Sequence, residues 1–403
     1  MSTREQRIEV FNDTQNWINQ DKTLSDSVAY SKAHTKIFYE DDYPKFNRPV
    51  HTNMTVNVTM DRSFQAAMRL HHENNGSKIA VMNFANAFHA GGGVTKGSSA
   101  QEECLCRTST LYPLLYRRTL RDSFYKHHND MDTPKASDSL IYTEDVIICK
   151  SDEDLPKRLS QDDWVTVDVI TVAAPDLRSK SNMHADLVGG GVRMNNAELY
   201  AYHVKRAIHV LTCAAAMGAD ILVLGAFGCG AFENDPNVVA LAYKNALSVF
   251  PNVFSIIEFA VYCNPSNTTN YEVFSHVLGD GWIAEKNKHG VNLSDENWGE
   301  DYLGMSENYY DRPAQIPVPR ERFDYLMNRY SPGDYEKWVI FHYFGHFMIY
   351  DKETKKCLYD VSYIEQKDSK LAAVITTIRI NMDNHSEDTD DDFGFIARLF
   401  MEC

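Results

Sequence analysis

Two short motifs near residue 95 combine residue types suited to chemistry on a sugar. Gly91, Gly92 and Gly93 are consecutive, and seven residues separate them from the triplet Gln101–Glu103. Glycines allow positive φ and let the backbone approach a ligand with no Cβ in the way. The paired carboxylates follow in what the pattern predicts to be the first turn of a helix. A glycine cradle beside an acid indicates glycosidic chemistry on a phosphorylated sugar.

The elements predicted around these motifs are a strand, a loop and a helix. The apolar run Lys78–Phe84 is typical of a β-strand. Ser99-x-x-Glu102 fits a capping box, and apolar residues at helical spacing continue from Gln101 to about Leu115. The alternative role for Glu102 is therefore a helix cap, and for Glu103 a first-turn acid that offsets the helix dipole.

A second glycine-rich turn, Gly225–Pro236, follows the buried strand pattern Ala219–Leu224 and precedes an amphipathic helix. Asp235 is placed as the N-cap of that helix and Pro236 as its first residue. Such a turn is a ready anion site because unpaired N–H groups point outward. Phe227 and Phe232 are placed to wall a sugar or base against it. The alternative is a tight strand-to-helix turn with packed aromatic rings.

Both loops together resemble the macrodomain superfamily, specifically the microbial-type poly(ADP-ribose) glycohydrolases. The family signature is a triple glycine followed, after a short spacer, by Gln-Glu-Glu, and Gly91–Gly93 with Gln101–Glu103 match it. Asn83–Asn86, Glu103–Tyr112 and Thr171–Asp176 are also similar to family segments. The resemblance spans roughly residues 1–285.

The resemblance implies hydrolysis of the ribose–ribose O-glycosidic bond in poly(ADP-ribose), from the chain end and without a cofactor. Glu103 would be the catalytic acid/base, and Glu102 would hold a hydroxyl of the adjacent ribose. Gln101 would fix that pair, Asn83 and Asn86 would bind the distal ribose, and the two glycine loops would enclose the diphosphate. The substrate-binding set implied in this way is Gln101, Asn83, Asn86, Gly91, Gly92, Gly93, Val94, Gly225, Ala226, Phe227, Gly228, Cys229, Gly230, Ala231 and Phe232.

Two physical points bear on the paired glutamates. Adjacent helical residues point about 100° apart, so Glu102 and Glu103 cannot flank a bond as an ordinary glycosidase pair does. A mechanism with one glutamate suits this geometry. A helix N-terminus lowers a carboxylate pKa, so substrate phosphates and desolvation would have to raise the pKa of the acid.

Composition fits a globular intracellular protein. Of the 403 residues, 43% are apolar, which is typical of a globular chain. The net charge of −16 argues against broad nucleic-acid binding. A polyanionic substrate would then be held by local N–H groups and a few cations, for which Arg107, Lys96 and Arg178 are candidates. The polar N-terminus predicts no signal peptide, and no run predicts a membrane span, so we expect a cytoplasmic or nuclear location and no membrane partner.

The eight cysteines are scattered, which indicates reduced thiols, and no Cys/His group has zinc spacing. His342 and His346 lie in a strand-like run and are interpreted as packed or surface residues. We therefore predict no metal.

Strands that alternate with helices predict an α/β fold with a mixed, macrodomain-like sheet flanked by helices. Val165–Val172 and Val253–Val261 are predicted strands, and residues 196–217 a helix. The polar stretch 116–163 is interpreted as an insertion or surface loop. The predicted organisation is an N-terminal helical accessory region, a catalytic domain, a linker and a small α+β C-terminal module, at residues 1–75, 76–285, 286–319 and 320–403.

Within the C-terminal module we expect a short helix at 321–330 and strands at 338–350, 357–363 and 371–380. The acidic run Glu387–Asp392 is interpreted as a solvated loop. The resemblance does not extend to this module; selecting a protein target, forming an oligomer and covering the core are its open roles.

Three functions remain open from the sequence. The first is a poly(ADP-ribose) glycohydrolase, and the second is a hydrolase of mono-ADP-ribosylated proteins with the same pocket. The third is a non-catalytic ADP-ribose reader. The presence of both Glu102 and Glu103 argues against a pure reader, because binding alone needs no carboxylate beside the glycosidic oxygen.

Overall fold

The computed structural model describes residues 2–40, 42–46, 51–131, 135–178, 194, 196–248, 250, 252–279, 309–327, 338–343, 346–351, 354, 356–365, 371–384 and 390–401. The chain divides into two compact units. The first comprises residues 1–194 and 202–286, and the second comprises residues 195–201 and 287–403.

The first unit is built on a seven-stranded sheet with the order β1-β4-β5-β3-β6-β7-β2. The strands from β5 to β2 are parallel, whereas β4 is antiparallel to both β1 and β5. The predicted mixed sheet is therefore confirmed. The strands are β1 Lys36–Phe38, β2 Thr55–Thr59, β3 Ile79–Ala85, β4 Leu140–Ile148, β5 Val165–Ala173, β6 Ile221–Leu224 and β7 Ile256–Ala260.

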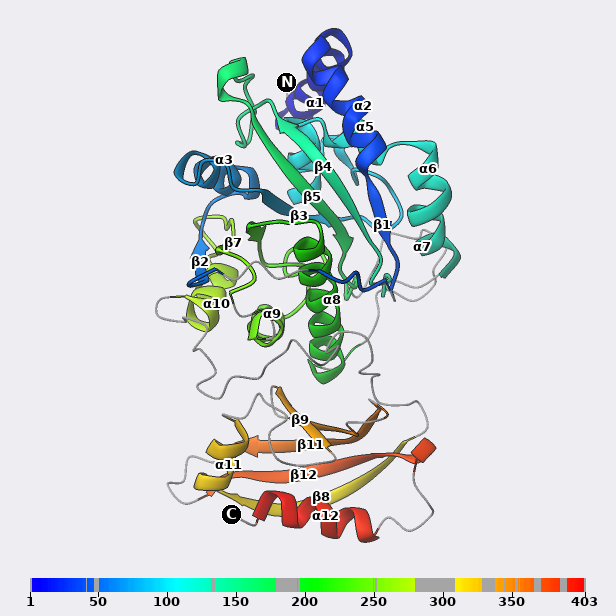
Figure 1. The fold of residues 1–403 in the computed structure, drawn as a ribbon, viewed down its shortest axis with the longest axis vertical. Coiled ribbons are helices and arrows are strands. Elements are labelled where there is room, and N and C mark those ends of the chain that lie inside the picture. Colours follow the sequence, from blue (N-terminus) through cyan, green and yellow to red (C-terminus); the bar gives the residue numbers. More distant parts are fainter. Residues whose placement is uncertain are drawn as a thin grey trace. The chain divides into compact units, whose positions relative to one another are not determined.

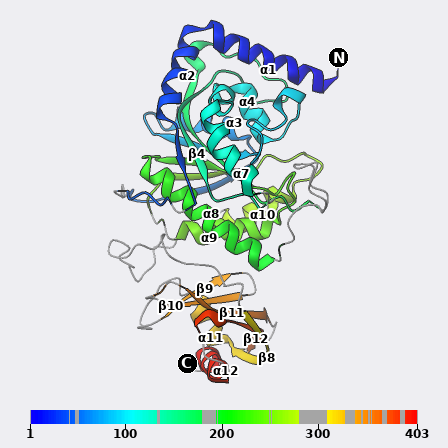
Figure 2. The same ribbon diagram turned by 90° about the vertical axis from the view of Figure 1, so that its right-hand side faces the viewer.

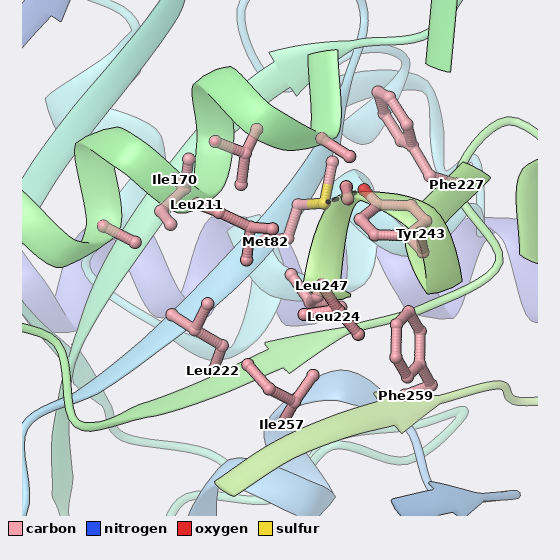
Figure 3. Packing of buried hydrophobic residues seen from close by; sticks show 14 of the residues in the cluster. Met82, Ile170, Leu211, Leu222, Leu224, Phe227, Tyr243, Leu247, Ile257 and Phe259 are labelled. Atoms are coloured by element: carbon pink, nitrogen blue, oxygen red, sulfur yellow. Dashed lines mark hydrogen bonds between the residues drawn. The ribbon is translucent and has the colours of Figure 1, made fainter. Parts of the chain in front are cut away.

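Helices cover both faces of this sheet (Figures 1 and 2). Successive strand side chains point to opposite faces, so Ala80 and Met82 of β3 join one core cluster while Ile79 and Val81 join the other. The Met82 cluster packs against α8 Asn196–Ala216, α9 Pro236–Ser248 and α10 Thr269–Leu278, as Figure 3 shows for part of it. The Val81 cluster packs against α1 Thr3–Gln20, α2 Lys22–His34, α3 Ser63–Glu73, α4 Gln101–Thr108 and α5 Leu111–Leu115.

Both edge strands, β1 and β2, come from the region 1–75 that the sequence set apart as an accessory region. They share one sheet with β3 and with the predicted catalytic domain. The strands predicted at 165–172, 219–224 and 253–261 and the helix at 196–217 are present with small shifts at their ends.

The prediction that residues 116–163 form an insertion or loop is wrong. This stretch contains the buried strand β4 as well as α6 Arg118–Leu120, a π-helical segment η2 Arg121–Tyr125 and α7 Lys126–Met131. The polar residues that interrupt the apolar pattern of β4 in the sequence lie at a bulge. There the register shifts between Thr143 and Val146, and Asp145 takes φ +55°. A bulge allows polar residues inside an otherwise buried strand.

The second unit contains an antiparallel sheet with the order β8-β12-β11-β10-β9. Its small α+β character confirms the fold predicted for the C-terminal module. Its elements are β8 Tyr309–Pro319, α11 Arg320–Met327, β9 Trp338–Tyr343, β10 His346–Asp351, β11 Cys357–Glu365, β12 Leu371–Asn381 and α12 Asp390–Met401.

Three local predictions for this unit are corrected. The proposed linker ends in β8, whose prolines are tolerated because β8 is an edge strand; residues 286–308 lie outside the described chain. The single strand predicted at 338–350 is two antiparallel strands, β9 and β10. The acidic run leads into α12, which begins at Asp390, where acidic residues favour a helix N-terminus; residues 387–389 are not described.

In the described part of the chain, no helix combines the length and apolar character that crossing a membrane requires.

Candidate functional site

Gln101 ties the start of α4 to β3. Its Oε1 accepts a hydrogen bond from the Phe84 N–H (2.8 Å), and its Nε2 donates to the Met82 carbonyl (2.7 Å) and to Ser63 Oγ (3.0 Å). Both amide protons are therefore used within the protein. Gln101 fixes the helix that carries the two glutamates, and its polar group is engaged by the chain itself rather than directed at substrate.

Glu102 is buried, with 3% of its surface exposed. Its Oε2 accepts from the Asn86 N–H (2.8 Å), and its Oε1 accepts from the Gly91 N–H (3.2 Å) and from Asn83 Nδ2 (3.5 Å). Burial raises the pKa of Glu102 to about 8, the charge of Glu103 adds to this rise, and the hydrogen bonds oppose it. Both oxygens of Glu102 are thus held by the protein.

Glu103 is held by only one of its oxygens. Oε1 accepts from the Gly93 N–H (2.8 Å), whereas Oε2 is buried and has no hydrogen-bond partner among the described residues. A buried polar atom without a partner is costly. Of the oxygens of Glu102 and Glu103, Oε2 of Glu103 is therefore the one that can exchange a proton with a ligand or accept a hydrogen bond from a ligand hydroxyl.

The triple glycine holds the glutamates. The N–H groups of Gly91 and Gly93 bind Glu102 and Glu103, and the Gly92 N–H donates to the His89 carbonyl (3.0 Å). Gly91 and Gly92 take φ +70° and +54°. All three N–H groups of the loop are therefore engaged within the chain, and the enclosure of the diphosphate by this loop stays a prediction.

The two asparagines differ in exposure. Asn83 is fully buried in β3; its Nδ2 donates to Thr171 Oγ1 (3.2 Å), and its Oδ1 has no partner in the described chain. Asn86 shapes the loop, because its Oδ1 accepts from the N–H groups of Phe88 and His89 (both 2.9 Å).

The predicted cap and extent of the first helix are corrected. Ala100 is the N-cap of α4, with no side-chain hydrogen bond, so Ser99 does not form a capping box. The Glu102 side chain turns instead toward the loop. The helix also ends at Thr108 rather than near Leu115, because Ser109 forms a β-bridge with Ile148 of β4 before α5 begins.

The second loop is organised by Asn234, which the sequence analysis did not single out. Its Nδ2 donates to the carbonyls of Pro175 (2.8 Å), Gly228 (3.2 Å) and Phe232 (3.2 Å). Its Oδ1 lies 2.8 Å from Nε2 of His203 on α8. Burial lowers the pKa of His203 to about 4. Because Asn234 Nδ2 faces three carbonyls, its Oδ1 is the acceptor and His203 Nε2 is the donor of this hydrogen bond. An asparagine just before Asp235-Pro236 was the available sequence signal.

The outer part of this loop can bind an anion. The N–H groups of Gly230, Ala231 and Phe232 donate no hydrogen bond within the described residues. Asp235 Oδ1 accepts from the Asn237 N–H (2.9 Å), and α9 begins at Pro236, as predicted. Gly228 has φ +78° at the turn.

Two predicted substrate contacts belong to the core instead. Phe227 is buried in the cluster of Figure 3, with its ring centroid 5.5 Å from that of Phe84 and 5.8 Å from that of His203, so its ring cannot wall a ligand. The Val94 side chain is fully buried in the other cluster. Of the two aromatic residues proposed as walls, Phe232 remains partly exposed.

The three candidate cations have different surroundings. Arg107 is buried and donates to the Ser98 carbonyl and to Cys104 Sγ, so it braces the loop from inside. Arg178 forms a bidentate pair with Asp176 and lies 5.4 Å from the Phe232 ring centroid. Lys96 is exposed.

The first helix supports the glycine loop from outside. Arg4 Nε on α1 donates to the Lys96 carbonyl (2.6 Å). Gly97, with φ +74°, packs so closely that a Cβ there would collide with the Arg4 carbonyl.

Comparisons with known proteins place this geometry in a family. Residues 5–151 match the model of the catalytic domain of microbial-type poly(ADP-ribose) glycohydrolase. A structure of that enzyme from Deinococcus radiodurans in complex with ADP-ribose is 30% identical, with a TM-score of 0.53; the match covers 62% of this chain and 96% of that chain. The chain belongs to the microbial-type poly(ADP-ribose) glycohydrolase family.

A second similar glycohydrolase is that of Thermomonospora curvata. It is 27% identical with a TM-score of 0.58, and the match covers 68% of this chain and 99% of that chain. A complex of the same protein with the inhibitor ADP-HPD has a TM-score of 0.56. No curated protein sequence matches the chain. The glycohydrolase family model includes the triple glycine and the Gln-Glu-Glu triplet, whereas the Gly225–Phe232 loop lies beyond it.

Proposed function

We propose that this glycohydrolase cleaves the ribose–ribose O-glycosidic bond of poly(ADP-ribose) and releases ADP-ribose, with Glu103 as its acid/base. The observation that carries the proposal is the half-satisfied carboxylate of Glu103: Oε1 is fixed by the Gly93 N–H, and Oε2 is buried without a partner in the described chain. Membership of the family makes the chain a glycosidase.

In the proposed reaction, Glu103 first donates a proton to the leaving ribose oxygen. The bond between that oxygen and the anomeric carbon breaks, which leaves an oxocarbenium-like centre. The Glu103 carboxylate then accepts a proton from water as the water oxygen bonds to the anomeric carbon, and this restores the acid. Glu103 serves as the acid in the first step and as the base in the second, because adjacent Glu102 and Glu103 cannot flank the bond as an ordinary glycosidase pair does.

Glu102 supports this reaction without being its acid. Its pKa is the one that burial raises, to about 8, but both of its oxygens already accept N–H groups. An acid must first reach the reacting oxygen, and neither oxygen of Glu102 is free to do so. A protonated Glu102 leaves a neutral neighbour beside Glu103 at pH 7.

The diphosphate is proposed to lie at the free N–H groups of residues 230–232. Phe232 is the remaining aromatic wall. The catalytic unit is proposed to extend over residues 76–285 with support from 1–75.

The test is release of ADP-ribose from purified poly(ADP-ribose), followed by chromatography. Glu103→Gln is expected to lower the rate by roughly 10²- to 10⁴-fold, the usual contribution of a general acid–base group. Calorimetry should show that it still binds ADP-ribose. Glu9→Gln, which changes an exposed glutamate of α1, is the control and should behave as wild type.

Absence of release by a wild-type protein that binds ADP-ribose would overturn the proposal. Release from mono-ADP-ribosylated protein alone would then identify the second candidate. Failure with both substrates would leave an ADP-ribose reader.

A further inference from the structure

A cavity of about 320 Å³ lies beside the triple glycine and has no part in the proposed reaction. Gly92 and Thr95 line it on one side, and the segment from Tyr112 to Tyr125 lines it on the other. Its volume is near the lower end for small-molecule sites, about 300–1,000 Å³. Gly92 borders this cavity and also packs against the carboxylate of Glu103.

The cavity is cationic in a chain whose net charge is −16. Arg117, Arg118 and Arg121 line it, and Asp122 is the sole acidic residue between positions 111 and 125. Asp122 pairs with Arg118 (3.1 Å) and Arg121 (3.3 Å), so two positive charges remain in excess. Arginine suits phosphate because its planar fork donates two parallel hydrogen bonds.

Arg117 is the least exposed of these arginines. Its Nη1 donates to the Lys32 carbonyl (2.7 Å), while its Nε is buried with no partner among the described residues. Burial lowers the pKa of Arg117, and no carboxylate offsets that effect. Arg117 also lines the cavity. Because a buried guanidinium N–H without a partner is costly, an anion bound beside this side chain would lower that cost.

Tyrosines add a stacking surface and a second unpaired donor. The rings of Tyr112 and Tyr116 stack with centroids 5.4 Å apart, and Tyr116 is 68% exposed. The hydroxyl of Tyr125, a residue that is 3% exposed, has no hydrogen-bond partner in the described chain. Exposed aromatic rings beside cations are how proteins hold a base next to its phosphates.

We propose that this cavity binds the ADP-ribose unit on the leaving-group side of the scissile bond. The arginines take its diphosphate, Tyr116 stacks on its adenine, and Tyr125 hydrogen-bonds to it. The proposal rests on the proposed function, because only a polymer presents such a unit next to the cleaved bond. Gly92, shared by the cavity and the carboxylates, places the two sites side by side.

The test measures binding in the Glu103→Gln background, where the substrate stays intact. The probes are ADP-ribose and a dimer of two ADP-ribose units joined through ribose. We expect the dimer to bind at least tenfold more tightly than the monomer. Arg118→Gln with Arg121→Gln should remove most of that gain and change monomer affinity less than twofold. Both side chains are mostly exposed, so the fold should persist.

The control is Lys22→Gln with Lys157→Gln, which removes the same charge from exposed positions elsewhere and should leave the gain intact. Tyr116→Ala should weaken dimer binding without affecting the monomer. Equal affinities for dimer and monomer would overturn the subsite, as would a dimer gain that survives loss of both arginines or an equal loss for both probes. If dimer binding depends on the arginines but wild type releases nothing from polymer, the cavity binds a second ADP-ribose unit, whereas the proposed cleavage, and with it the leaving-group assignment, fails.

Discussion

A Cβ atom on Gly92 would lie 2.5 Å from Oε1 of Glu103 and 3.2 Å from Oε2 of Glu102. Oε1 of Glu103 is also the atom that the Gly93 N–H holds. The backbone at residue 92 is therefore in contact with both carboxylates at once, and any side chain there must displace the proposed acid.

We predict that Gly92→Ala lowers the rate of ADP-ribose release at least about 100-fold, because a shift of about 1 Å at a catalytic group has that order of effect. Gly76→Ala is the matched control. Gly76 has φ +88°, and no atom lies within 4 Å of the position that a Cβ would take, so it shares the backbone strain without the contact. Both variants should lose roughly 1–2 kcal/mol of unfolding free energy. Equal activity in the two variants would show that a side chain at residue 92 leaves Glu103 in place.

We predict that the free energy of unfolding depends on pH through Glu102. Its pKa is raised from 4.5 to about 8 in the folded state, so the folded protein keeps a proton that the unfolded chain releases above pH 4.5. The free energy of unfolding therefore falls between about pH 5 and 8, by up to about 1.4 kcal/mol per pH unit. Glu102→Gln cannot titrate and should flatten this slope in urea unfolding at pH 5, 6, 7 and 8. Slopes that match those of wild type and Glu9→Gln would count against a raised pKa.

Asn234→Ala should loosen the second loop. It removes an amide that donates to three carbonyls and leaves His203 without its acceptor, which costs roughly 2–4 kcal/mol for buried polar groups. Calorimetry should show ADP-ribose affinity at least tenfold weaker. Asn237→Ala, two residues past Asp235 and exposed, is the control. Unchanged affinity in Asn234→Ala would mean that the loop does not hold the diphosphate.

Gln101→Leu tests the tether between α4 and β3. Three hydrogen bonds are lost at similar side-chain volume, so we expect kcat to fall at least tenfold while KM changes less than threefold. The melting temperature should also fall, because the Phe84 N–H and the Met82 carbonyl lose partners. A rise in KM with unchanged kcat would instead indicate that Gln101 contacts substrate.

The sequence anticipates the strands and the closeness of the glycines to Gln101–Glu103, because these features depend on local pattern. The buried strand β4 could not be predicted from the sequence, because the polar residues Thr143–Asp145 interrupt its apolar run at a bulge. In the second unit, the prolines of β8 suggest a linker although an edge strand accommodates them. In each case, pairing with a distant strand overrides the local signal.

In the candidate site, too, only the local features follow from the sequence. The spacing of the motifs indicates which residues lie near Glu103, but it does not indicate which acceptor each N–H group binds. The sequence of Gly91–Gly93 suggests a phosphate cradle, and it does not reveal that the N–H groups of Gly91 and Gly93 donate to the two glutamates. Asn234 and His203 lie 31 positions apart and meet only through packing of α8. The Phe227 ring turns into the core for a similar reason, since its ring partners Phe84 and His203 come from β3 and α8.

Through the contact between Arg4 and the Lys96–Gly97 backbone, the docking of α1 is coupled to substrate binding at the glycine loop. If docking of this helix stabilises the glycine loop, then a ligand that orders the loop must stabilise the docking of the helix by the same free energy. Amides of α1, some 90 positions before the glutamates, should therefore exchange more slowly with deuterium when ADP-ribose is bound.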